Sequence, residues 1–491
     1  MSVDGSSQAT TAQSSADQAH DVVILGAGSG GYACALRAAQ FGLTVALIEE
    51  AQVGGTCLHQ GCIPTKALLH AAEVADQARD AATFGVRASL EGIDMAGVQA
   101  YKDGVVTRLF RGLTGLIESR SITVVPGRGV LSGPRSVTVT DADGGVREVR
   151  GRAIVLATGS YAKTIPGIEP DGRHILTSDH ALVLDRVPAS AIVLGGGVIG
   201  CEFASVWRSF GAEVTVVEAL PRLVPTEEEA SSKVLQRAFR KRRIGIKTGV
   251  VVTGVEVTGP EAGSEAGTEA GAGGVRVSLE GAEPLTAKVL LIAVGRGPRT
   301  AGIGLEEHGV QLDRGFVVTD DEGRTSVPTV YAVGDIVPGL QLAHRGFAQG
   351  IALAERLAGA TVAPVRDELI PRVTYCSPEV ASVGLTRAQA EARYGAAEVS
   401  VLTYDLGGNG KSQILKTQGQ VTLIRHNDGP VVGIHLVGDR VGEMIGEAQL
   451  IVGWEAHPDD VAALVHAHPT QNEALGEAHL ALAGKPLHMH S

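Results

Sequence analysis

Two stretches of the chain share one glycine spacing: DVVILGAGSGG at residues 21–31 and AIVLGGGVIG at residues 191–200. Each begins with apolar residues typical of a buried strand and continues as Gly-x-Gly-x-x-Gly before a helical stretch. A second strand then ends in an acid, Glu49 or Glu218, at the same interval from the first glycine in both copies. The glycines of the pattern are Gly26, Gly28 and Gly31, then Gly195, Gly197 and Gly200.

The repeated pattern predicts two dinucleotide-binding βαβ units. In such units the first glycine permits a tight turn, the second lets the backbone approach a pyrophosphate, and the third lets the helix pack on the strand. The helix N-terminus adds partial positive charge near the phosphates. The acid accepts hydrogen bonds from ribose hydroxyls and repels a 2′-phosphate. The alternative is a pair of glycine-rich turns in another kind of α/β sheet.

Three further strand-like runs, at residues 152–157, 289–294 and 330–333, end in glycine-containing turns. Ligands of α/β proteins bind at the carboxyl edge of a parallel sheet, where such strands end. The candidate ligand-contacting residues after these runs are Thr158, Gly159, Ser160, Gly295, Gly334 and Asp335.

A different motif, GGTCLHQGCIPTK at residues 54–66, places Cys57 and Cys62 five positions apart. In a regular helix this spacing separates the Cα atoms by roughly 8–9 Å, whereas a disulfide needs about 4.4–6.8 Å. A bond would therefore require a distorted first turn, which Pro64 favours because it has no N–H to donate. A helix expected at residues 67–79 would also lower a thiolate's pKa. The motif indicates a redox-active pair.

Zinc binding and unrelated buried thiols are the other interpretations of this pair. Zinc is disfavoured because the spacing is not Cys-x-x-Cys and no second pair follows, so no metal is predicted. The three remaining cysteines, Cys34, Cys201 and Cys376, have no comparable context.

Composition limits the class of protein. The chain of 491 residues is long enough for about three domains, and its hydrophobic content of 44% excludes a mainly disordered protein. A net charge of −12 argues against nucleic acid or an anionic membrane as the main partner. Five cysteines are too few for a secreted disulfide framework, and we recognise no signal peptide, so we expect a cytoplasmic protein.

From about residue 370 the glycine pattern does not recur. Alternating strands, such as residues 420–425 and 431–437, mix with helices and predict an α+β domain. Near its end, HAHPTQNE places Glu473 five residues after His468. A carboxylate there can orient a histidine base. A structural or solvent-exposed histidine is the alternative.

Together these motifs resemble those of the pyridine nucleotide-disulfide oxidoreductases, most closely the branch that oxidises dihydrolipoamide. The resemblance is carried by GGTCLHQGCIPTK, GGGVIGCEFASVW, AVGD, PEVASVG and HAHPTQNEA. It implies an α/β fold with two Rossmann-like domains, for FAD and NAD, and a C-terminal α+β dimerisation domain. The implied reaction oxidises protein-bound dihydrolipoamide to lipoamide and reduces NAD⁺ to NADH.

The resemblance also implies roles for individual residues. Cys57 would exchange with the substrate, and Cys62 would be the thiol next to the flavin. His468, held by Glu473, would be the base that reaches Cys57 of the partner subunit.

FAD would occupy the first glycine pattern and NAD the second, with Glu49 and Glu218 on the respective riboses. Lys66 and Glu202 match the pair beside the flavin. The resemblance places further residues around FAD, namely Gly55, Thr56, Gly129, Thr158, Gly159, Ser160, Asp335 and Ala343. It places Val251 and Gly295 near NAD.

The implied partners are a second copy of the chain, in a homodimer, and lipoyl domains. The lipoyl domains would belong to acyltransferase components of 2-oxoacid dehydrogenase complexes or to the glycine-cleavage H protein. The chain departs from frequent family residues at four positions, which are His59, Gln60, Thr65 and Arg299. The first three lie beside the cysteines and remove no reacting group, whereas Arg299 changes an expected NAD contact.

Other members of the family are the alternatives. Glutathione reductases use NADPH, against which Glu218 argues. Mercuric reductases and large thioredoxin reductases would need a cysteine pair or selenocysteine near the C-terminus, but no cysteine follows Cys376. Soluble transhydrogenases lack the redox disulfide. A non-catalytic flavoprotein paralogue would have lost a reacting group, and none is lost here.

We expect five segments along the chain. They are a disordered tail at residues 1–20, the first part of the FAD domain at 21–162, the NAD domain at 163–294 with a flexible loop at 259–274, the second part of the FAD domain at 295–368, and the dimerisation domain at 369–491.

Overall fold

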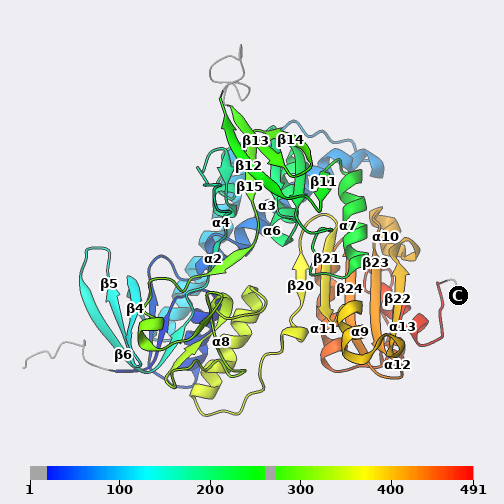
Figure 1. Cartoon of the computed structure of the whole chain (residues 1–491). Coiled ribbons are helices and arrows are strands. Elements are labelled where there is room, and N and C mark those ends of the chain that lie inside the picture. The colour runs from blue at the N-terminus through cyan, green and yellow to red at the C-terminus, as the bar shows by residue number, and fades with distance from the viewer. Residues whose placement is uncertain (1–18, 260–272, 490–491) are drawn as a thin grey trace, which may run out of the picture.

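The structure is a computed structural model that describes residues 19–259 and 273–489 (Figure 1). Almost all of the tail expected at residues 1–20 and of the loop expected at 259–274 lies outside the described residues. Three large sheets with their helices form the three parts of the molecule, at the lower left, top and right of Figure 1.

The first glycine pattern lies on a seven-stranded sheet with the order β3-β2-β1-β6-β5-β4, in which β19 also pairs with β6. β1 runs parallel to β2 and β6, so their carboxyl ends lie side by side. The strands are β1 (His20–Leu25), β2 (Val45–Glu49), β3 (Thr123–Pro126), β4 (Arg128–Gly133), β5 (Ser136–Thr140), β6 (Val146–Leu156) and β19 (Val330–Ala332). The helices of this part are α1 (Ser29–Gln40), α2 (Gly55–His59), α3 (Cys62–Asp80), α4 (Met95–Ser119) and α8 (Ala343–Leu357).

The second glycine pattern lies on a five-stranded parallel sheet with the order β11-β10-β9-β15-β8. Its elements are β8 (Ile175–Leu176), α5 (Ser178–Ala181), β9 (Ser190–Leu194), α6 (Val198–Phe210), β10 (Glu213–Glu218), α7 (Glu229–Lys241), β11 (Gly245–Thr248) and β15 (Val289–Ile292). A smaller antiparallel sheet adjoins it, with β12 (Val252–Thr258), β13 (Gly274–Leu279) and β14 (Ala282–Ala287). β12 pairs with β13 in antiparallel orientation, so the two strands on either side of residues 260–272 lie next to each other.

Two short ribbons complete the region between these sheets. One pairs β7 (Ser160–Ala162) with β16 (Arg296–Pro298), and the other pairs β17 (Leu312–Asp313) with β18 (Phe316–Val317). Because β19 then pairs with β6, the chain returns to the first sheet after building the second.

The C-terminal part is an antiparallel sheet with the order β20-β21-β24-β23-β22. Its strands are β20 (Arg372–Thr374), β21 (Glu379–Gly384), β22 (Val399–Asp405), β23 (Gln420–His426) and β24 (Val431–Gly438). Its helices are α9 (Arg387–Tyr394), α10 (Gly410–Leu415), α11 (Val441–Gly453), α12 (Pro458–Ala462) and α13 (Glu473–Leu482). The expected α/β fold with an α+β C-terminal domain is confirmed, whereas the exact borders of the five segments stay a prediction.

One buried apolar cluster joins all three parts. It contains Leu68 of α3, Phe203 of α6, Cys376 after β20 and Val437 of β24. Burial of these side chains together stabilises the relative placement of the parts. In the described part of the chain, no helix is both long and apolar enough to cross a bilayer.

Candidate active site

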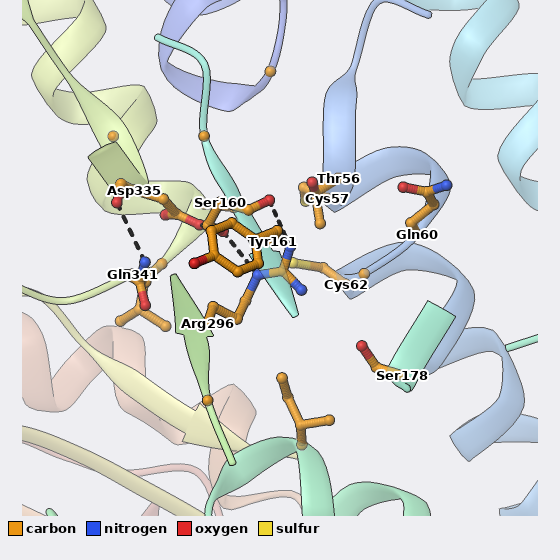
Figure 2. Close-up of a pocket in the computed structure, with 18 of the residues that line it drawn as sticks. Thr56, Cys57, Gln60, Cys62, Ser160, Tyr161, Ser178, Arg296, Asp335 and Gln341 are labelled. Atoms are coloured by element: carbon orange, nitrogen blue, oxygen red, sulfur yellow. Dashed lines mark hydrogen bonds between the residues drawn. The ribbon is translucent and has the colours of Figure 1, made fainter. Parts of the chain in front are cut away.

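A single cleft with a volume of about 1810 Å³ runs past both glycine patterns and the cysteine pair (Figure 2). Most of the residues expected at the site line it, and they are Gly26, Gly28, Glu49, Gly55, Thr56, Cys57, Cys62, Lys66, Gly129, Thr158, Gly159, Ser160, Gly195, Gly197, Glu202, Glu218, Val251, Gly295, Asp335 and Ala343. Four expected residues do not line it: Gly31, Gly200, His468 and Glu473.

The three glycines of the first pattern meet three different spatial demands. Gly26 has a φ of +99°, and a Cβ there would lie 2.4 Å from the carbonyl oxygen of Ala157. A Cβ on Gly31 would lie 1.9 Å from the carbonyl oxygen of Gly26, so the glycine lets α1 pack on its strand. A Cβ on Gly28 would meet nothing within 4 Å, which leaves open space at the N-terminus of α1.

The second pattern repeats this geometry. Gly195 has a φ of +111°, and a Cβ there would lie 2.3 Å from the carbonyl oxygen of Ala293. A Cβ on Gly200 would lie 1.9 Å from the carbonyl oxygen of Gly195, and one on Gly197 would meet nothing within 4 Å. Both helix N-termini therefore face free space in which an anionic group is favoured.

The two acids at the strand ends also hold matching positions. Glu49 accepts hydrogen bonds from the amides of Ala27 at 2.7 Å and Ala51 at 2.9 Å. Glu218 accepts them from the amides of Gly196 at 2.6 Å and Leu220 at 2.7 Å. Each carboxylate oxygen keeps a second lone pair, so both acids can still accept from ribose hydroxyls.

Arg222, four residues after Glu218, does not direct its guanidinium into the cleft. The Arg222 guanidinium donates to the carbonyl of Pro225 at 2.8 Å, and Arg222 does not line the cleft. A 2′-phosphate beside Glu218 would therefore meet a carboxylate, which favours NAD over NADP.

A polar network lies at the ends of β7, β16 and β19 (Figure 2). The Ser160 hydroxyl donates to the Asp335 carboxylate at 2.5 Å, and the Arg296 Nε donates to the same hydroxyl at 2.8 Å. Gln341 donates to the Asp335 carbonyl at 3.2 Å. Arg296 and Gln341 were not singled out from the sequence, although Arg296 directly follows the glycine that ends a strand-like run.

The residues present fit FAD at the first pattern. Open space adjoins Gly28 and Gly159, where a Cβ would meet nothing within 4 Å. A helix N-terminus for a pyrophosphate, Glu49 for a ribose and Asp335 for further hydroxyls line the same stretch of cleft. This set has the donors and acceptors that a dinucleotide requires.

The cysteines lie on two helices rather than on one distorted turn. α2 ends at His59 and α3 begins at Cys62, so that Gln60 and Gly61 separate the two helices. α3 therefore starts five residues earlier than expected. Pro64 cannot donate to the carbonyl of Gln60, which prevents one continuous helix. A Cβ on Gly61 would lie 2.9 Å from a backbone oxygen of Thr56.

The Cys57 and Cys62 side chains are in hydrogen-bond contact with each other. The hydrogen bond from Cys57 is the main cause that lowers the pKa of Cys62 to about 7; burial opposes this shift, and the charge of Lys66 adds to it. The pKa of Cys57 is raised, first by its hydrogen bond to Cys62 and then by burial. Cys62 is thus the thiol that ionises first.

Lys66 stands one helical turn after Cys62. Its Nζ lies 2.9 Å and 3.0 Å from the two carboxylate oxygens of Glu202 on α6. Burial disfavours the charged ammonium, but the carboxylate outweighs it, so the pKa of Lys66 is raised. The side chain of Glu202 is only 3% exposed, and the pair brings a positive charge close to the thiols.

His468 and Glu473 form a second pair on the surface of the C-terminal part. The His468 Nδ1 lies 2.7 Å from a carboxylate oxygen of Glu473, and the other oxygen accepts from the Thr470 amide at 2.8 Å. Burial raises the pKa of Glu473, but the Thr470 and His468 contacts outweigh it and the pKa is lowered. The His468 side chain is 76% exposed, so its Nε2 is open to a reactant.

The neighbouring His466 is a structural histidine by contrast. Its Nε2 lies 2.7 Å from Glu447, which also accepts from Asn472 at 2.6 Å. The hydrogen bond to Glu447 is the main cause that raises the pKa of His466. A Cβ on Gly476 would lie 2.5 Å from its Nδ1, so the ring has little free space.

The four departures from the family pattern have defined contacts. The His59 Nε2 bonds the carbonyl of Val53 at 2.9 Å, and the Thr65 hydroxyl donates to the Gly61 carbonyl at 2.6 Å. Gln60 lines the cleft with both thiols. The Arg299 guanidinium lies 3.5 Å from Glu50, beside the first nucleotide acid rather than the second.

Comparison with protein families agrees with this geometry. The family described as pyridine nucleotide-disulphide oxidoreductase matches residues 20–350, and the dimerisation domain of the same family matches residues 370–479. The chain belongs to this family. It is therefore a flavoprotein oxidoreductase with FAD and NAD as cofactors and a C-terminal dimerisation domain.

Curated relatives and solved structures cover nearly the whole chain. Dihydrolipoyl dehydrogenase of Chlorobaculum tepidum is 40% identical over 93% of this chain and 96% of that protein. Dihydrolipoyl dehydrogenase of Bacillus subtilis is 37% identical over 96% of this chain and 99% of that protein. The crystal structure of LpdA from Mycobacterium tuberculosis is 27% identical, with a TM-score of 0.85 over 94% of this chain and 99% of that one.

Proposed function

We propose that this protein is a dihydrolipoyl dehydrogenase, which converts dihydrolipoamide and NAD⁺ to lipoamide, NADH and a proton. One observation carries the proposal: a pair of hydrogen-bonded thiols lies in one cleft with two dinucleotide patterns. The dihydrolipoyl dehydrogenases among the relatives support the substrate.

In the first step His468 accepts a proton from one thiol of dihydrolipoamide. The resulting thiolate attacks the sulfur of Cys57 in the oxidised pair, so that a mixed disulfide forms and the Cys57–Cys62 bond breaks. Cys62 leaves as a thiolate. Its lowered pKa and the nearby ammonium of Lys66 support this role, because a thiol of lower pKa is the better leaving group.

Before the second step the imidazolium of His468 releases its proton to solvent, which is the proton of the overall equation. The neutral ring then accepts the proton of the other substrate thiol, whose thiolate attacks the substrate sulfur of the mixed disulfide. Lipoamide is released with its ring closed, and Cys57 leaves as a thiolate that takes up a proton from the imidazolium of His468. Glu473 keeps the imidazole oriented and stabilises its charged form. Bound FAD would supply the two-electron chemistry that links the dithiol to NAD⁺.

Several residue roles belong to the same proposal. Glu49 holds the adenosine ribose of FAD and Glu218 that of NAD, while Gly28 and Gly197 leave room for the pyrophosphates. Lys66 and Glu202 lie beside the flavin, and the other residues that line the cleft complete the two sites. The five segments expected along the chain would divide these sites as follows: FAD between 21–162 and 295–368, NAD within 163–294.

The base would act in the partner subunit of a homodimer. His468 does not line the cleft of its own chain, and its side chain is 76% exposed. We therefore propose that the His468–Glu473 pair completes the cleft of the partner at Cys57. The natural donors would be lipoyl domains of 2-oxoacid dehydrogenase acyltransferases or of the glycine-cleavage H protein, in the cytoplasm.

The decisive assay measures NADH formation by the FAD-loaded dimer with dihydrolipoamide and NAD⁺. We expect turnover, with a much lower kcat/KM for NADP⁺ because of Glu218. Reduced glutathione with NAD⁺ is the matched control donor. No NADH with dihydrolipoamide, or equal rates with glutathione, would contradict the proposal.

A further inference from the structure

Two residues from different parts of the molecule contact the Lys66 ammonium. Its Nζ binds both carboxylate oxygens of Glu202 on α6. It also lies 4.7 Å from the ring centroid of Tyr375, which follows β20 of the C-terminal sheet. Tyr375 lines the cleft but belongs to none of the motifs recognised in the sequence.

The backbone of Tyr375 is hydrogen-bonded to the carboxylate of the same ion pair. Its amide donates at 3.0 Å to the Glu202 oxygen that lies nearest to Lys66. Two residues later, the Ser377 amide donates at 3.0 Å to the hydroxyl of Ser205 on the same helix. These two bonds hold the segment against α6, so the Tyr375 ring is placed over the ammonium by backbone contacts.

The contact has the geometry of a cation–π interaction. The ammonium is attracted by the electron-rich ring face, and the attraction is stronger where water is partly excluded. Glu202 is buried, but the Lys66 side chain is 33% exposed at the cleft. The ring therefore adds a second restraint on a side chain that solvent can reach.

The position of the Lys66 ammonium affects the pKa of the Cys62 thiol. After the hydrogen bond from Cys57, which is the largest cause, Lys66 lowers the pKa of Cys62, whereas burial and the Glu202 carboxylate raise it. Tyr32 and Arg296 also interact electrostatically with Cys62. If the ammonium left its place, the negative charge of Glu202 would be uncompensated beside Cys62.

We propose that the ring of Tyr375 is a positioning residue that holds the Lys66 ammonium beside Cys62. Through this contact the C-terminal part of the chain keeps Cys62 ready to leave as a thiolate. The proposal rests on the role proposed above for Cys62. It assigns the effect to the face of the ring and not to the hydroxyl.

The test compares Tyr375→Leu with Tyr375→Phe, which keeps the ring and removes only the hydroxyl. Each FAD-loaded protein is reduced with dithiothreitol, and alkylation of Cys62 by iodoacetamide is followed by peptide mass spectrometry between about pH 5 and 9. We expect Tyr375→Phe to match the unaltered protein. In Tyr375→Leu, alkylation near neutral pH should be ~3- to 10-fold slower, with the Cys62 profile moved to higher pH.

An unchanged profile in Tyr375→Leu, or equal slowing in both variants, would overturn the proposal. A double-mutant cycle separates positioning from a general loss of structure. In a Lys66→Met background, Tyr375→Leu should have no further effect on Cys62, whereas a further shift of the same size would contradict the proposal. Alkylation needs neither dihydrolipoamide nor NAD⁺, so its outcome is distinguishable from failure of the proposed dehydrogenase activity.

Discussion

The Lys66–Glu202 pair in the cleft and the His468–Glu473 pair on the C-terminal surface are built differently. Lys66 and Glu202 come from α3 and α6, and the carboxylate is 3% exposed. His468 and Glu473 are five residues apart in the chain, and the histidine is 76% exposed. The inner pair is complete within one folded chain, whereas the outer pair faces away from it. This difference supports the proposal that each chain supplies its His468–Glu473 pair to the cleft of the partner subunit.

The largest expected loss of activity follows from a substitution in the cleft. Cys57→Ser removes the sulfur that must form the mixed disulfide, so turnover of dihydrolipoamide should fall by at least ~1,000-fold. The FAD content should stay unchanged, because the hydroxyl leaves the fold of α2 intact. The rate of NADH formation and the flavin absorbance of the purified variant check both parts. Full activity would refute the assigned role of Cys57.

At the His468–Glu473 pair we expect the loss of only one of two activities. His468→Gln removes the base, so NADH formation from dihydrolipoamide should slow by ~100- to 10,000-fold. Reduction of an artificial acceptor by NADH should hardly change, because that reaction does not need the exposed pair. The ratio of the two rates is the measurement. Equal losses in both assays would mean that His468 is structural.

One Glu→Gln substitution in each pair compares how much the two pairs contribute to the free energy of unfolding. Glu202→Gln leaves a partly buried ammonium without its counter-charge and should destabilise the fold by about 2 kcal/mol. Glu473→Gln, at the exposed pair, should change the free energy of unfolding by less than about 0.5 kcal/mol. Denaturant unfolding of both variants tests this contrast. Equal destabilisation would show that the pairs do not differ as described.

An effect smaller than that of Glu202→Gln concerns the pH dependence of stability that is due to Glu379, whose charge acts on Tyr375. Burial raises the pKa of Glu379 to about 7. In the unfolded chain Glu379 loses its proton at a pKa near 4.5, whereas in the folded protein it keeps the proton up to about pH 7. The free energy of unfolding therefore falls as the pH rises from 4.5 to about 7. Glu379→Gln should add about 1 kcal/mol of stability at pH 8 and little at pH 5. Thermal unfolding at both pH values checks this, and an equal gain at both would contradict it.

The sequence predicted the local part of this site well. The equal glycine spacings, the strand ends and the cysteine motif depend on short-range geometry, and most of the residues they marked line one cleft. The family, the fold class and the cofactors inferred from these motifs are confirmed. α3 begins at Cys62 and not at residue 67, because Pro64 lies in its first turn, where the missing N–H removes no intrahelical hydrogen bond.

The parts that the sequence did not predict depend on contacts between distant segments. Tyr375 reaches Lys66 only because the chain after β20 packs on α6. Arg296 meets Ser160 only through the pairing of β7 with β16. The contact of His466 with Glu447 was not predicted either, because Glu447 lies on α11, outside the motif HAHPTQNE.

Hybrid dimers test the central claim most directly. Co-expressed, differently tagged Cys57→Ser and His468→Gln chains would be purified as the mixed dimer and assayed for NADH formation from dihydrolipoamide. If Cys57 of one chain works with the partner's His468, one of the two sites contains both intact groups, and about half of the unaltered activity per dimer should return. If each site used residues of a single chain, both sites of the hybrid would be defective. Activity no higher than that of the parent variants would contradict the account.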